Sequence, residues 1–559
     1  MNTAERNLAR ADAFVAALAA AGLRHVAFGP GARSAPLAAA FLRRPEVACH
    51  VINDERAAGF FALGIGRATG RPAAVLTTSG TAAANLLPAL MEANLAAVPL
   101  LALTADRPTE AVGWGANQTA DQTRLYGDQV RAFHALPLPD EAIDTRSLNM
   151  LAARLVETSL APVPGPVHAN LPFREPLLPE SIPAPPPLPA PLAIRAPVPA
   201  APEHLDDIAA RLSGRPGVIL CGEAGYPADF AAAAARLAAS LDAPIIAEPL
   251  SGLRHGPHDR SRILVHAARF LRDTSLPALP APDWVLRFGA FPVSRTLERW
   301  LAGLHDAHHV LVAPPGRWPD PLKRSDTLLR GDPLAVAAAL GALCRPAGTD
   351  FCRAWRDADA QAAVPHDPSF FEGTVARSLL AALPAGAHVF VGNSLAIRAV
   401  DAFGGQSDKT LALHGNRGAS GIDGNLATAA GIAAATGNPT ALLIGDQTLL
   451  HDCGSLALLA GRNVVILVLD NGGGGIFDHL PFAAALSPEL LARGWTASPR
   501  VDIAALAAAF GLHHATAGNT GDLDAALETA FVQGGAWLLR AVIDRRASRA
   551  GFQSNFRQA

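Results

Sequence analysis

The stretch ALLIGDQTLLHDCGSLALLAGRNVVILVLDNGGGG, residues 441–475, decides the fold. It contains two apolar runs, Ala441–Ile444 and Val464–Leu469, and each is followed by polar or glycine residues. The intervening residues Leu449–Gly461 predict a crossover helix. Two short β-type runs joined by a helix are typical of a right-handed βαβ unit in a parallel sheet.

Polar side chains follow both predicted strands, with Asp446 after the first and Asn471 after the second. Because the carboxyl ends of neighbouring parallel strands meet at one edge of a sheet, we expect these two side chains to lie close together. A carboxylate, an amide oxygen and a backbone carbonyl from the glycine run suit Mg²⁺. The spacing alone leaves a second interpretation open, in which Asp446 caps a helix and Asn471 belongs to a turn.

A second glycine-rich stretch, HGNRGASGIDG at 414–424, precedes a predicted helix of small residues at 426–435. Glycine lets the backbone approach a ligand closely, and the N-terminus of a helix favours an anion. The spacing does not fit the GxGxxG pattern. A ligand-binding loop and a plain tight loop therefore both remain open.

Similar β-type runs alternate with alanine-rich helical stretches along the chain, which predicts an α/β fold with three doubly wound parallel-sheet domains. Proline marks the first boundary, because 11 of the 27 residues at 176–202 are proline, too many for a helix or an interior strand. The predicted parts are a first domain at 1–178, a linker at 179–203, a central domain at 204–345 and a third domain at 366–559. The other expected strands are 26–28, 74–77, 98–103, 218–221, 244–247, 310–312, 389–391 and 537–542.

Composition excludes several classes of protein. The chain has 559 residues, 50% hydrophobic and 17% charged, and a formal net charge of -3, so we expect a globular protein without a nucleic-acid partner. Its five cysteines lack zinc-site spacing and read as thiols in a reducing compartment. Apolar stretches end short of the roughly 18 residues of a membrane helix, and the N-terminus lacks a signal-peptide pattern. We therefore expect a cytoplasmic protein without membrane insertion.

Polar loops also follow the strands of the first domain. The loop GPGARS at 29–34 follows one strand, and NDER at 53–56 opens a predicted helix. Glu55 is the ionisable residue that stands out there, although a glutamate in the first turn of a helix also simply complements the helix dipole. Further strand-end loops are TSGT at 78–81, TADRP at 104–108 and GANQ at 115–118.

Together these motifs resemble a family of thiamine-diphosphate-dependent enzymes, the 2-succinyl-5-enolpyruvyl-6-hydroxy-3-cyclohexene-1-carboxylate (SEPHCHC) synthases of the menaquinone pathway, or MenD family. The spacing of Asp446 and Asn471 is similar to the thiamine-diphosphate signature. The resemblance covers the first and third domains well and the central domain thinly. Its motifs are GARSAPL (31–37), NDERAAGFFALG (53–64), TTSGTAAANLLPALMEA (77–93), LTADRP (103–108), GANQ (115–118), VGNSLAIR (391–398) and NRGASGIDG (416–424).

The resemblance implies thiamine diphosphate, bound between the first domain of one subunit and the third domain of its neighbour, and hence a homodimer or homotetramer. Glu55 would contact N1′ of the aminopyrimidine and promote removal of the thiazolium C2 proton. Asp446, Asn471 and the Gly473 carbonyl would hold Mg²⁺, or Mn²⁺, on the diphosphate. The other implied cofactor-binding residues are Gly80, Asn117, Gly418, Gly421, Ile422, Ile476 and Phe477.

The implied reaction is decarboxylation of 2-oxoglutarate followed by conjugate addition to isochorismate. These substrates bring several carboxylates, which guanidinium groups bind in planar pairs. The resemblance assigns Arg33, Arg107, Asn117 and Gln118 to isochorismate. It assigns Ser394 and Arg398 to the succinyl-forming part and adds Arg295 and Arg417 as substrate-binding residues. The implied catalytic set is Glu55, Arg33, Gln118, Ser394 and Arg398.

The chain departs from the family's usual pattern at four positions. Ala32 stands where serine is usual, Ser294 where lysine is frequent, Asp470 where asparagine is common and Gln447 where many members have leucine. One lost hydrogen bond to a charged group costs about 1.5 to 3 kcal/mol, so these changes bear on substrate range more than on the cofactor.

Two other classes of function remain to be weighed. One is a different thiamine-diphosphate-dependent 2-oxoacid carboligase or decarboxylase, which the arginines argue against because small neutral acceptors need no such cluster. The other is a non-catalytic protein on the same fold. Loss of Glu55, Asp446 or Asn471 would indicate that class, and all three residues are present.

Overall fold

The computed structural model describes residues 1–139, 144–190, 205–272, 279–363 and 369–554. Residues 191–203 of the predicted linker and 366–368 at the start of the predicted third domain lie outside this part of the chain. The chain forms two compact units. Unit 1 comprises Met1–Ala196, Asn416–Gly437 and Asp452–Arg462, and unit 2 comprises Pro197–Gly415, Asn438–His451 and Asn463–Ala559. The domain boundaries expected from the sequence stay predictions.

Unit 1 contains a six-stranded parallel sheet in the order β2-β1-β3-β4-β6-β5. Its central strands are buried along their whole length, as expected for a parallel sheet covered on both faces. The strands are β1 (His25–Phe28), β2 (Ala48–Val51), β3 (Ala73–Thr77), β4 (Leu100–Asp106), β5 (Phe133–Ala135) and β6 (Pro166–Pro172). The helices are α1 (Thr3–Ala20), α2 (Ala35–Leu42), α3 (Glu55–Thr69), α4 (Thr81–Ala84), α5 (Leu87–Ala96), α6 (Thr145–Leu160) and α15 (Asn425–Thr436), with 3₁₀ turns η1 (Thr109–Ala111), η2 (Gly127–Gln129) and η4 (Cys453–Leu459).

Helices α3 and α15 pack closely although about 370 residues separate them in the sequence. Glycines at the crossing make this approach possible. A Cβ at Gly64 would overlap the carbonyl oxygen of Thr428, and one at Gly431 would overlap that of Phe61. The segment that follows the 414–424 loop is thereby held within unit 1.

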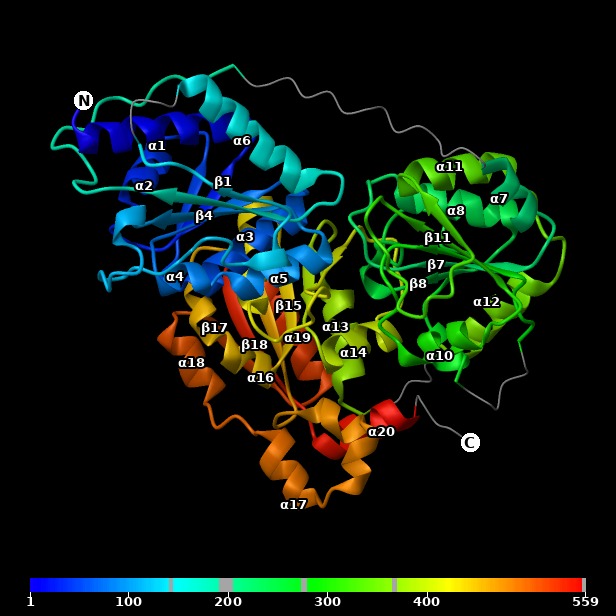
Figure 1. Ribbon diagram of the computed structural model, residues 1–559. Helices are drawn as coiled ribbons and strands as arrows, with labels where there is room; N and C mark the ends of the chain where they lie inside the picture. Colours follow the sequence, from blue (N-terminus) through cyan, green and yellow to red (C-terminus); the bar gives the residue numbers. More distant parts are fainter. Residues whose placement is uncertain (140–143, 191–204, 273–278, 364–368, 555–559) are drawn as a thin grey trace. The chain divides into compact units, whose positions relative to one another are not determined.

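Unit 2 contains two six-stranded parallel sheets. The central one has the order β12-β11-β10-β7-β8-β9. Helices α7, α8 and α11 cover one of its faces, and α10 and α12 cover the other (Figure 1). The strands are β7 (Gly217–Cys221), β8 (Ile245–Ala247), β9 (Ile263–Leu264), β10 (Trp284–Phe288), β11 (His308–Ala313) and β12 (Thr327–Arg330). The helices are α7 (Leu205–Leu212), α8 (Phe230–Leu241), η3 (Pro249–Ser251), α9 (Ala267–Phe270), α10 (Arg295–Gly303), α11 (Pro333–Leu343) and α12 (Phe351–Gln361).

The third sheet has the order β14-β13-β15-β16-β18-β17, and all its pairs are parallel. Its core packs against α13, α14, α19 and α20. The strands are β13 (His388–Val391), β14 (Ala412–His414), β15 (Thr440–Gly445), β16 (Val464–Asp470), β17 (His513–Ala517) and β18 (Ala536–Val542). The helices are α13 (Glu372–Ala382), α14 (Leu395–Phe403), α16 (Asp446–His451), α17 (Pro488–Leu491), α18 (Ile503–Ala509), α19 (Thr520–Gln533) and α20 (Arg545–Ser554), with η5 (Gly475–His479), η6 (Pro481–Ala485) and the π-turn η7 (Ala492–Thr496).

The α/β fold with three parallel sheets is confirmed, and each strand expected from the sequence is present. The expected single helix at 449–461 is wrong. The chain forms α16 and then the 3₁₀ helix η4, with Asp452 between them. The Asp452 carboxylate accepts hydrogen bonds from the Leu426 and Ala427 amides, which belong to the first turn of α15. Asp452 therefore caps another helix instead of continuing its own.

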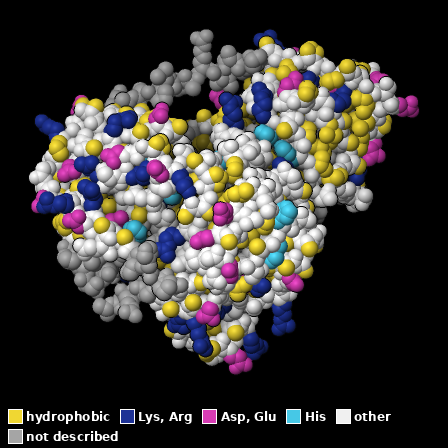
Figure 2. Space-filling view, turned by 180° about the vertical axis from the view of Figure 1, so that it is seen from behind, with side chains coloured by type: hydrophobic (Ala, Val, Ile, Leu, Met, Phe, Trp, Pro, Cys, Tyr) yellow, Lys and Arg dark blue, Asp and Glu magenta, His cyan; other side chains and the backbone are white. Residues whose placement is uncertain are grey.

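Among the described residues, no helix combines the length and apolar character needed to cross a bilayer. Figure 2 shows basic and acidic side chains interspersed on one face of the molecule rather than gathered by sign.

Candidate active site

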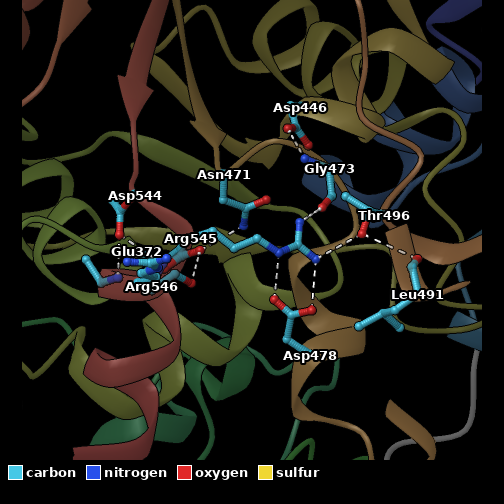
Figure 3. A network of polar contacts seen from close by, with 12 residues as sticks. Glu372, Asp446, Asn471, Gly473, Asp478, Leu491, Thr496, Asp544, Arg545 and Arg546 are labelled. Carbon is cyan, nitrogen blue, oxygen red and sulfur yellow. Dashed lines mark hydrogen bonds and ion pairs between the residues drawn. The ribbon is translucent and has the colours of Figure 1, made fainter. Parts of the chain in front are cut away.

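The predicted metal ligands come together at the carboxyl edge of the third sheet. Strands β15 and β16 are parallel neighbours, so Asp446 and Asn471 follow adjacent strand ends. One Asp446 oxygen accepts from the Gly473 amide at 2.7 Å (Figure 3). The other accepts from the Gln447 amide at 2.7 Å. Asp446 is also the first residue of α16, which agrees with the interpretation that places it at a helix start. Its role as a metal ligand stays a prediction.

The Asp446 carboxylate lies in an environment that disfavours its negative charge. Burial, together with the nearby carboxylate of Asp470, raises the pKa of Asp446 to about 6. Asp470 is itself paired with Arg540, with a Nε to Oδ2 distance of 2.7 Å. In the described part of the chain, no group of three or more His, Cys, Asp or Glu side chains is arranged to hold a metal. The predicted metal site would therefore need amide and carbonyl oxygens beside the Asp446 carboxylate.

Two residues that the sequence reasoning missed orient Asn471. The Asn471 side-chain amide donates to Glu372 Oε1 at 2.8 Å, and Ser548 Oγ donates to the same oxygen at 2.8 Å. Glu372 is fully buried, and its other oxygen, Oε2, has no hydrogen-bond partner among the described residues. Burial raises the pKa of Glu372. Because the Asn471 nitrogen points to Glu372, its oxygen is turned toward the side of Asp446 and Gly473 (Figure 3).

Arg545 is a third residue that the sequence reasoning missed (Figure 3). It contacts the carbonyl group of Gly473, whereas Asp446 contacts the amide group of the same residue. Its NH1 group donates to the Gly473 carbonyl at 2.6 Å. It also forms a two-pronged pair with Asp478, through Nε at 2.7 Å and NH2 at 2.9 Å. NH2 donates further to Thr496 Oγ1 at 3.3 Å. These contacts fix the direction of the Gly473 carbonyl, which is one of the predicted metal ligands.

Within the glycine run, position 473 requires glycine for a local reason. Gly473 has φ +86°, and a Cβ there would overlap the Thr496 carbonyl oxygen, since η7 packs directly against the run. Gln447, one of the departures from the family pattern, donates from Nε2 to the Thr496 carbonyl at 2.8 Å. In this chain Gln447 therefore joins the end of η7 to the sheet edge that carries Asp446.

Unit 2 also contains a cavity of about 1510 Å³. Three of the predicted residues line it: Arg295, Arg398 and Ile476. Ser394 precedes α14 with φ +66°, a conformation that side chains rarely adopt, and its carbonyl accepts from Arg398 NH1 at 2.8 Å. Phe477 follows Ile476 in η5 and contacts the ring of Phe482.

In unit 1, Arg33 and Arg107 meet on one carboxylate that the sequence reasoning missed. Arg33 NH2 lies 2.7 Å from Glu175 Oε1, and Arg107 NH1 lies 3.5 Å from the same atom. Arg33 is buried, and burial together with the charge of Arg107 lowers its pKa. The Glu175 side chain is 67% exposed, so it can leave this position at low cost.

A buried polar network connects this arginine pair to the Gly80 loop. Asn170 accepts from Gln122 at 2.9 Å and donates to Asp106 at 2.7 Å, and Asp106 accepts from the Arg107 amide at 2.7 Å. Gln122 in turn accepts from the Gly80 amide at 3.0 Å. The network fixes both loops relative to the sheet.

The remaining predicted residues of unit 1 lie on loops at the sheet edge and in the 414–424 segment. Gln118 donates from Nε2 to the Ser79 carbonyl at 3.0 Å, beside Gly80, and Asn117 is exposed. Glu55 is the first residue of α3, whose cap is Asp54. The Gly418 amide donates to buried Glu92 at 2.9 Å. Arg417, Gly421 and Ile422 lie in the same segment, with Ile422 37% exposed.

Both ends of the chain match known families. Residues 9–129 match "Thiamine pyrophosphate enzyme, N-terminal TPP binding domain", and residues 401–541 match "Thiamine pyrophosphate enzyme, C-terminal TPP binding domain". With the parallel sheets and the polar loops at their carboxyl edges, these matches define an enzyme of the thiamine pyrophosphate class.

Similarity to individual proteins extends over nearly the whole chain. The chain is 43% identical to the 2-succinyl-5-enolpyruvyl-6-hydroxy-3-cyclohexene-1-carboxylate synthase of Dechloromonas aromatica, over 95% of this chain and 98% of that one. It is 39% identical to the synthase of Sorangium cellulosum, over 95% and 92%, and 40% identical to that of Halobacterium salinarum, over 98% and 97%. The chain belongs to the SEPHCHC synthase family of thiamine-pyrophosphate-dependent transferases.

Proposed function

We propose that this enzyme decarboxylates 2-oxoglutarate and adds the succinyl carbanion to isochorismate, giving SEPHCHC for menaquinone biosynthesis. The observation that carries the proposal is the pairing of Arg33 and Arg107 on the single carboxylate of Glu175. Two guanidinium groups on one carboxylate are the arrangement that a carboxylate-bearing acceptor requires. The names of the relatives point to the same reaction.

The residues at the third sheet edge fit a divalent metal. Asp446 supplies a buried carboxylate, Asn471 has its amide oxygen turned toward that carboxylate, and Gly473 supplies a carbonyl. These are hard oxygen donors of the kind that Mg²⁺ and Mn²⁺ accept, with phosphate oxygens completing the shell. We assign these three residues to the metal. When bound, thiamine diphosphate supplies the carbanion chemistry, while the protein supplies position and proton transfer.

Glu55 is the proposed acid–base residue. A carboxylate at the start of a helix can share a proton with a ring nitrogen of the cofactor. Gly80, Asn117, Gly418, Gly421, Ile422, Ile476 and Phe477 are proposed to contact the cofactor.

Substrate recognition is assigned to both units. Arg33, Arg107, Asn117 and Gln118 are proposed to bind isochorismate, and Arg417 is proposed to bind a substrate carboxylate. Ser394, Arg398 and Arg295 are proposed to bind the 2-oxoglutarate part, since Arg295 and Arg398 line one cavity.

A homodimer or larger assembly completes the proposal, with each site shared between two subunits. Helix α5 supports this because Leu87, Met91 and Leu95 are 37%, 37% and 48% exposed and recur every four residues on one face. An exposed apolar stripe on a helix is typical of a surface that another chain covers.

One observation favours a second candidate, a related carboligase with a different substrate range. Ser294 stands where a lysine is frequent in the family, and its hydroxyl caps α10 by accepting from the Thr296 amide at 3.2 Å. Position 294 therefore contributes a hydroxyl group and not a cation to the cavity wall.

The experiment follows isochorismate absorbance after mixing purified protein with thiamine diphosphate, Mg²⁺, 2-oxoglutarate and isochorismate, each omitted in turn. We expect decay only when all four are present. Replacing 2-oxoglutarate by pyruvate provides the comparison for substrate range. Stable isochorismate, together with CO₂ release from another 2-oxoacid, would overturn the synthase and support the second candidate.

A further inference from the structure

The C-terminal helix α20 presents one face to the metal-binding edge of the third sheet. Arg545, Ser548 and Phe552 are spaced i, i+3 and i+7 and therefore share a face. Asp544 caps this helix by accepting from the Arg546 and Ala547 amides, both at 2.9 Å. The first turn of α20 is thus fixed at the point where Arg545 leaves it.

Aromatic packing anchors the other end of this face. Phe552 is buried, and its ring contacts Phe371 at a centroid distance of 6.0 Å and Phe403 at 5.8 Å. Phe371 immediately precedes Glu372, and Gly551 lies against the Phe371 ring, where a side chain would not fit. Helix α20 and the start of α13 therefore pack as one rigid block.

Two chains of contacts lead from this block to the predicted metal ligands. In the first, Arg545 donates to the Gly473 carbonyl and is itself held by the two oxygens of Asp478. In the second, Ser548 donates to Glu372, whose same oxygen accepts from the Asn471 amide. One helix therefore controls the direction of a carbonyl and of an amide oxygen that lie two residues apart in the sequence (Figure 3).

We propose that α20 is the positioning element of the metal-binding loop, with Arg545 and Glu372 as its positioning residues for Gly473 and Asn471. The inference rests on the metal assignment made under the proposed function. Glu372 acts by accepting two hydrogen bonds at Oε1, which leaves Asn471 only one favourable orientation of its amide. Arg545 acts by holding the Gly473 carbonyl while its pairing with Asp478 fixes η5. Neither residue touches the metal.

The test measures equilibrium binding of thiamine diphosphate by titration calorimetry at increasing Mg²⁺, on full-length protein freed of cofactor and metal. Removing outer-shell partners of metal ligands typically costs 10- to 100-fold in metal affinity. We therefore expect Arg545→Gln and Glu372→Ala each to raise the half-saturating Mg²⁺ concentration by about 10-fold or more. Glu372→Gln keeps an acceptor oxygen and should stay within about 3-fold of the unmodified protein.

Two exposed residues of the same unit provide matched controls. Arg353→Gln and Glu528→Gln remove the same charges from α12 and α19 and should leave the Mg²⁺ midpoint unchanged. Ser548→Ala removes one hydroxyl group and so tests the contacts from Ser548 through Glu372 to Asn471 without creating a large cavity. It should raise the midpoint by about 2- to 5-fold, which corresponds to one hydrogen bond. Thermal unfolding without ligands verifies that each variant is folded.

Wild-type midpoints in Arg545→Gln and Ser548→Ala would overturn the proposal, whatever happens to Glu372→Ala. Cofactor binding by the unmodified protein that needs no divalent metal would also overturn it, because the loop would then have nothing to position. If isochorismate is not consumed while Mg²⁺-dependent binding persists, the synthase assignment fails and this test still decides the role of α20.

Discussion

The first and third sheets have the same strand order. Numbered within its own sheet, each reads 2-1-3-4-6-5, whereas the central sheet reads 6-5-4-1-2-3. The corresponding carboxyl edges carry different chemistry. After the third and fourth strands, the first sheet presents Thr78–Thr81 and Arg107, while the third presents Asp446 and Asn471. The same strand order therefore carries two different sets of loops, with hydroxyl and guanidinium groups at the first edge and carboxylate and amide groups at the third.

The two edges are also supported differently. In the first sheet, polar residues inside the strands, such as Thr104, His168 and Asn170, hold the loops through a buried network. In the third sheet, β15 and β16 are apolar between Thr440 and Asp470, and helices supply the support through Glu372 and Arg545. The loops at the carboxyl edge of a doubly wound sheet can therefore be held by polar side chains within the strands or by side chains of neighbouring helices.

The largest expected effect separates chemistry from binding at the first sheet edge. Glu55→Gln should lower turnover by about 10²- to 10⁴-fold, because it removes the proposed acid–base group. Binding of thiamine diphosphate should change little, since the metal and diphosphate contacts lie elsewhere. Steady-state kinetics and calorimetry on the same preparation measure both. Glu46→Gln, an exposed neighbour, is the control. Near-normal turnover would remove Glu55 from the mechanism.

Substitution of Asp446 at the third sheet edge should impair cofactor binding, in contrast to Glu55→Gln, which should impair turnover. Asp446→Ala should weaken Mg²⁺-dependent cofactor binding by more than about 100-fold, since it removes a proposed ligand and not only its support. Titration of Mg²⁺ at fixed thiamine diphosphate measures this, with Asp524→Ala on the surface of α19 as the control. Unchanged Mg²⁺ dependence of cofactor binding would contradict the assignment of Asp446 as a metal ligand.

A smaller effect is expected at the arginine pair of the first edge. Glu175 occupies the guanidinium groups proposed to bind the isochorismate carboxylate, so it competes with the substrate. Glu175→Ala should lower the KM for isochorismate by about 2- to 5-fold, the value of an exposed ion pair, with little change in kcat. Exposed Glu180→Ala should change neither parameter. A raised KM would mean that Glu175 holds the arginines in place for the substrate.

The last prediction concerns stability in acid and not activity, and it tests the buried polar network of the first sheet. Burial lowers the pKa of His168 to about 3, whereas an unfolded histidine titrates near 6.5. The folded protein therefore binds fewer protons, and stability is full above pH 6.5 and declines as the pH falls toward 3. Near pH 5 this one residue accounts for about 2 kcal/mol.

The unfolding temperature should fall less between pH 7.5 and pH 5 in His168→Gln than in the unmodified protein, because glutamine does not titrate. Thermal scans at the two pH values measure this loss in both proteins. An equal loss in the variant and the unmodified protein would exclude His168 as a source of acid sensitivity.

Much of the fold could be predicted because alternating apolar runs and helices are a local signal. The strands that sequence reasoning missed have identifiable reasons. Strand β6 begins and ends with proline and contains the polar residues His168 and Asn170, so its sequence lacks the apolar run by which buried strands are recognised. Strand β10 contains Arg287, which is buried and paired with Asp320. Several others are short strands at sheet edges, where burial leaves little pattern.

The candidate site was also predictable only in part. Strand ends and a helix start in the sequence predict where Asp446, Asn471 and Glu55 lie, whereas the roles proposed for them come from the family resemblance. Glu372, Glu175 and Arg545 could not be predicted, since their partners lie far away in the chain, 99 residues from Glu372 to Asn471 for example. A glutamate at the start of the largely apolar α13 was the one available signal, and it resembles an ordinary helix-dipole residue.

The most direct test of the central claim combines the two edges in one assembly. Glu55→Gln and Asp446→Ala chains, coexpressed with different tags, can be purified as mixed dimers. If each site takes Glu55 from one subunit and Asp446 from the other, a mixed dimer has one intact site. It should then turn over 2-oxoglutarate and isochorismate at about half the unmodified rate. Mixed dimers as inactive as either parent variant would contradict a site shared between the two edges.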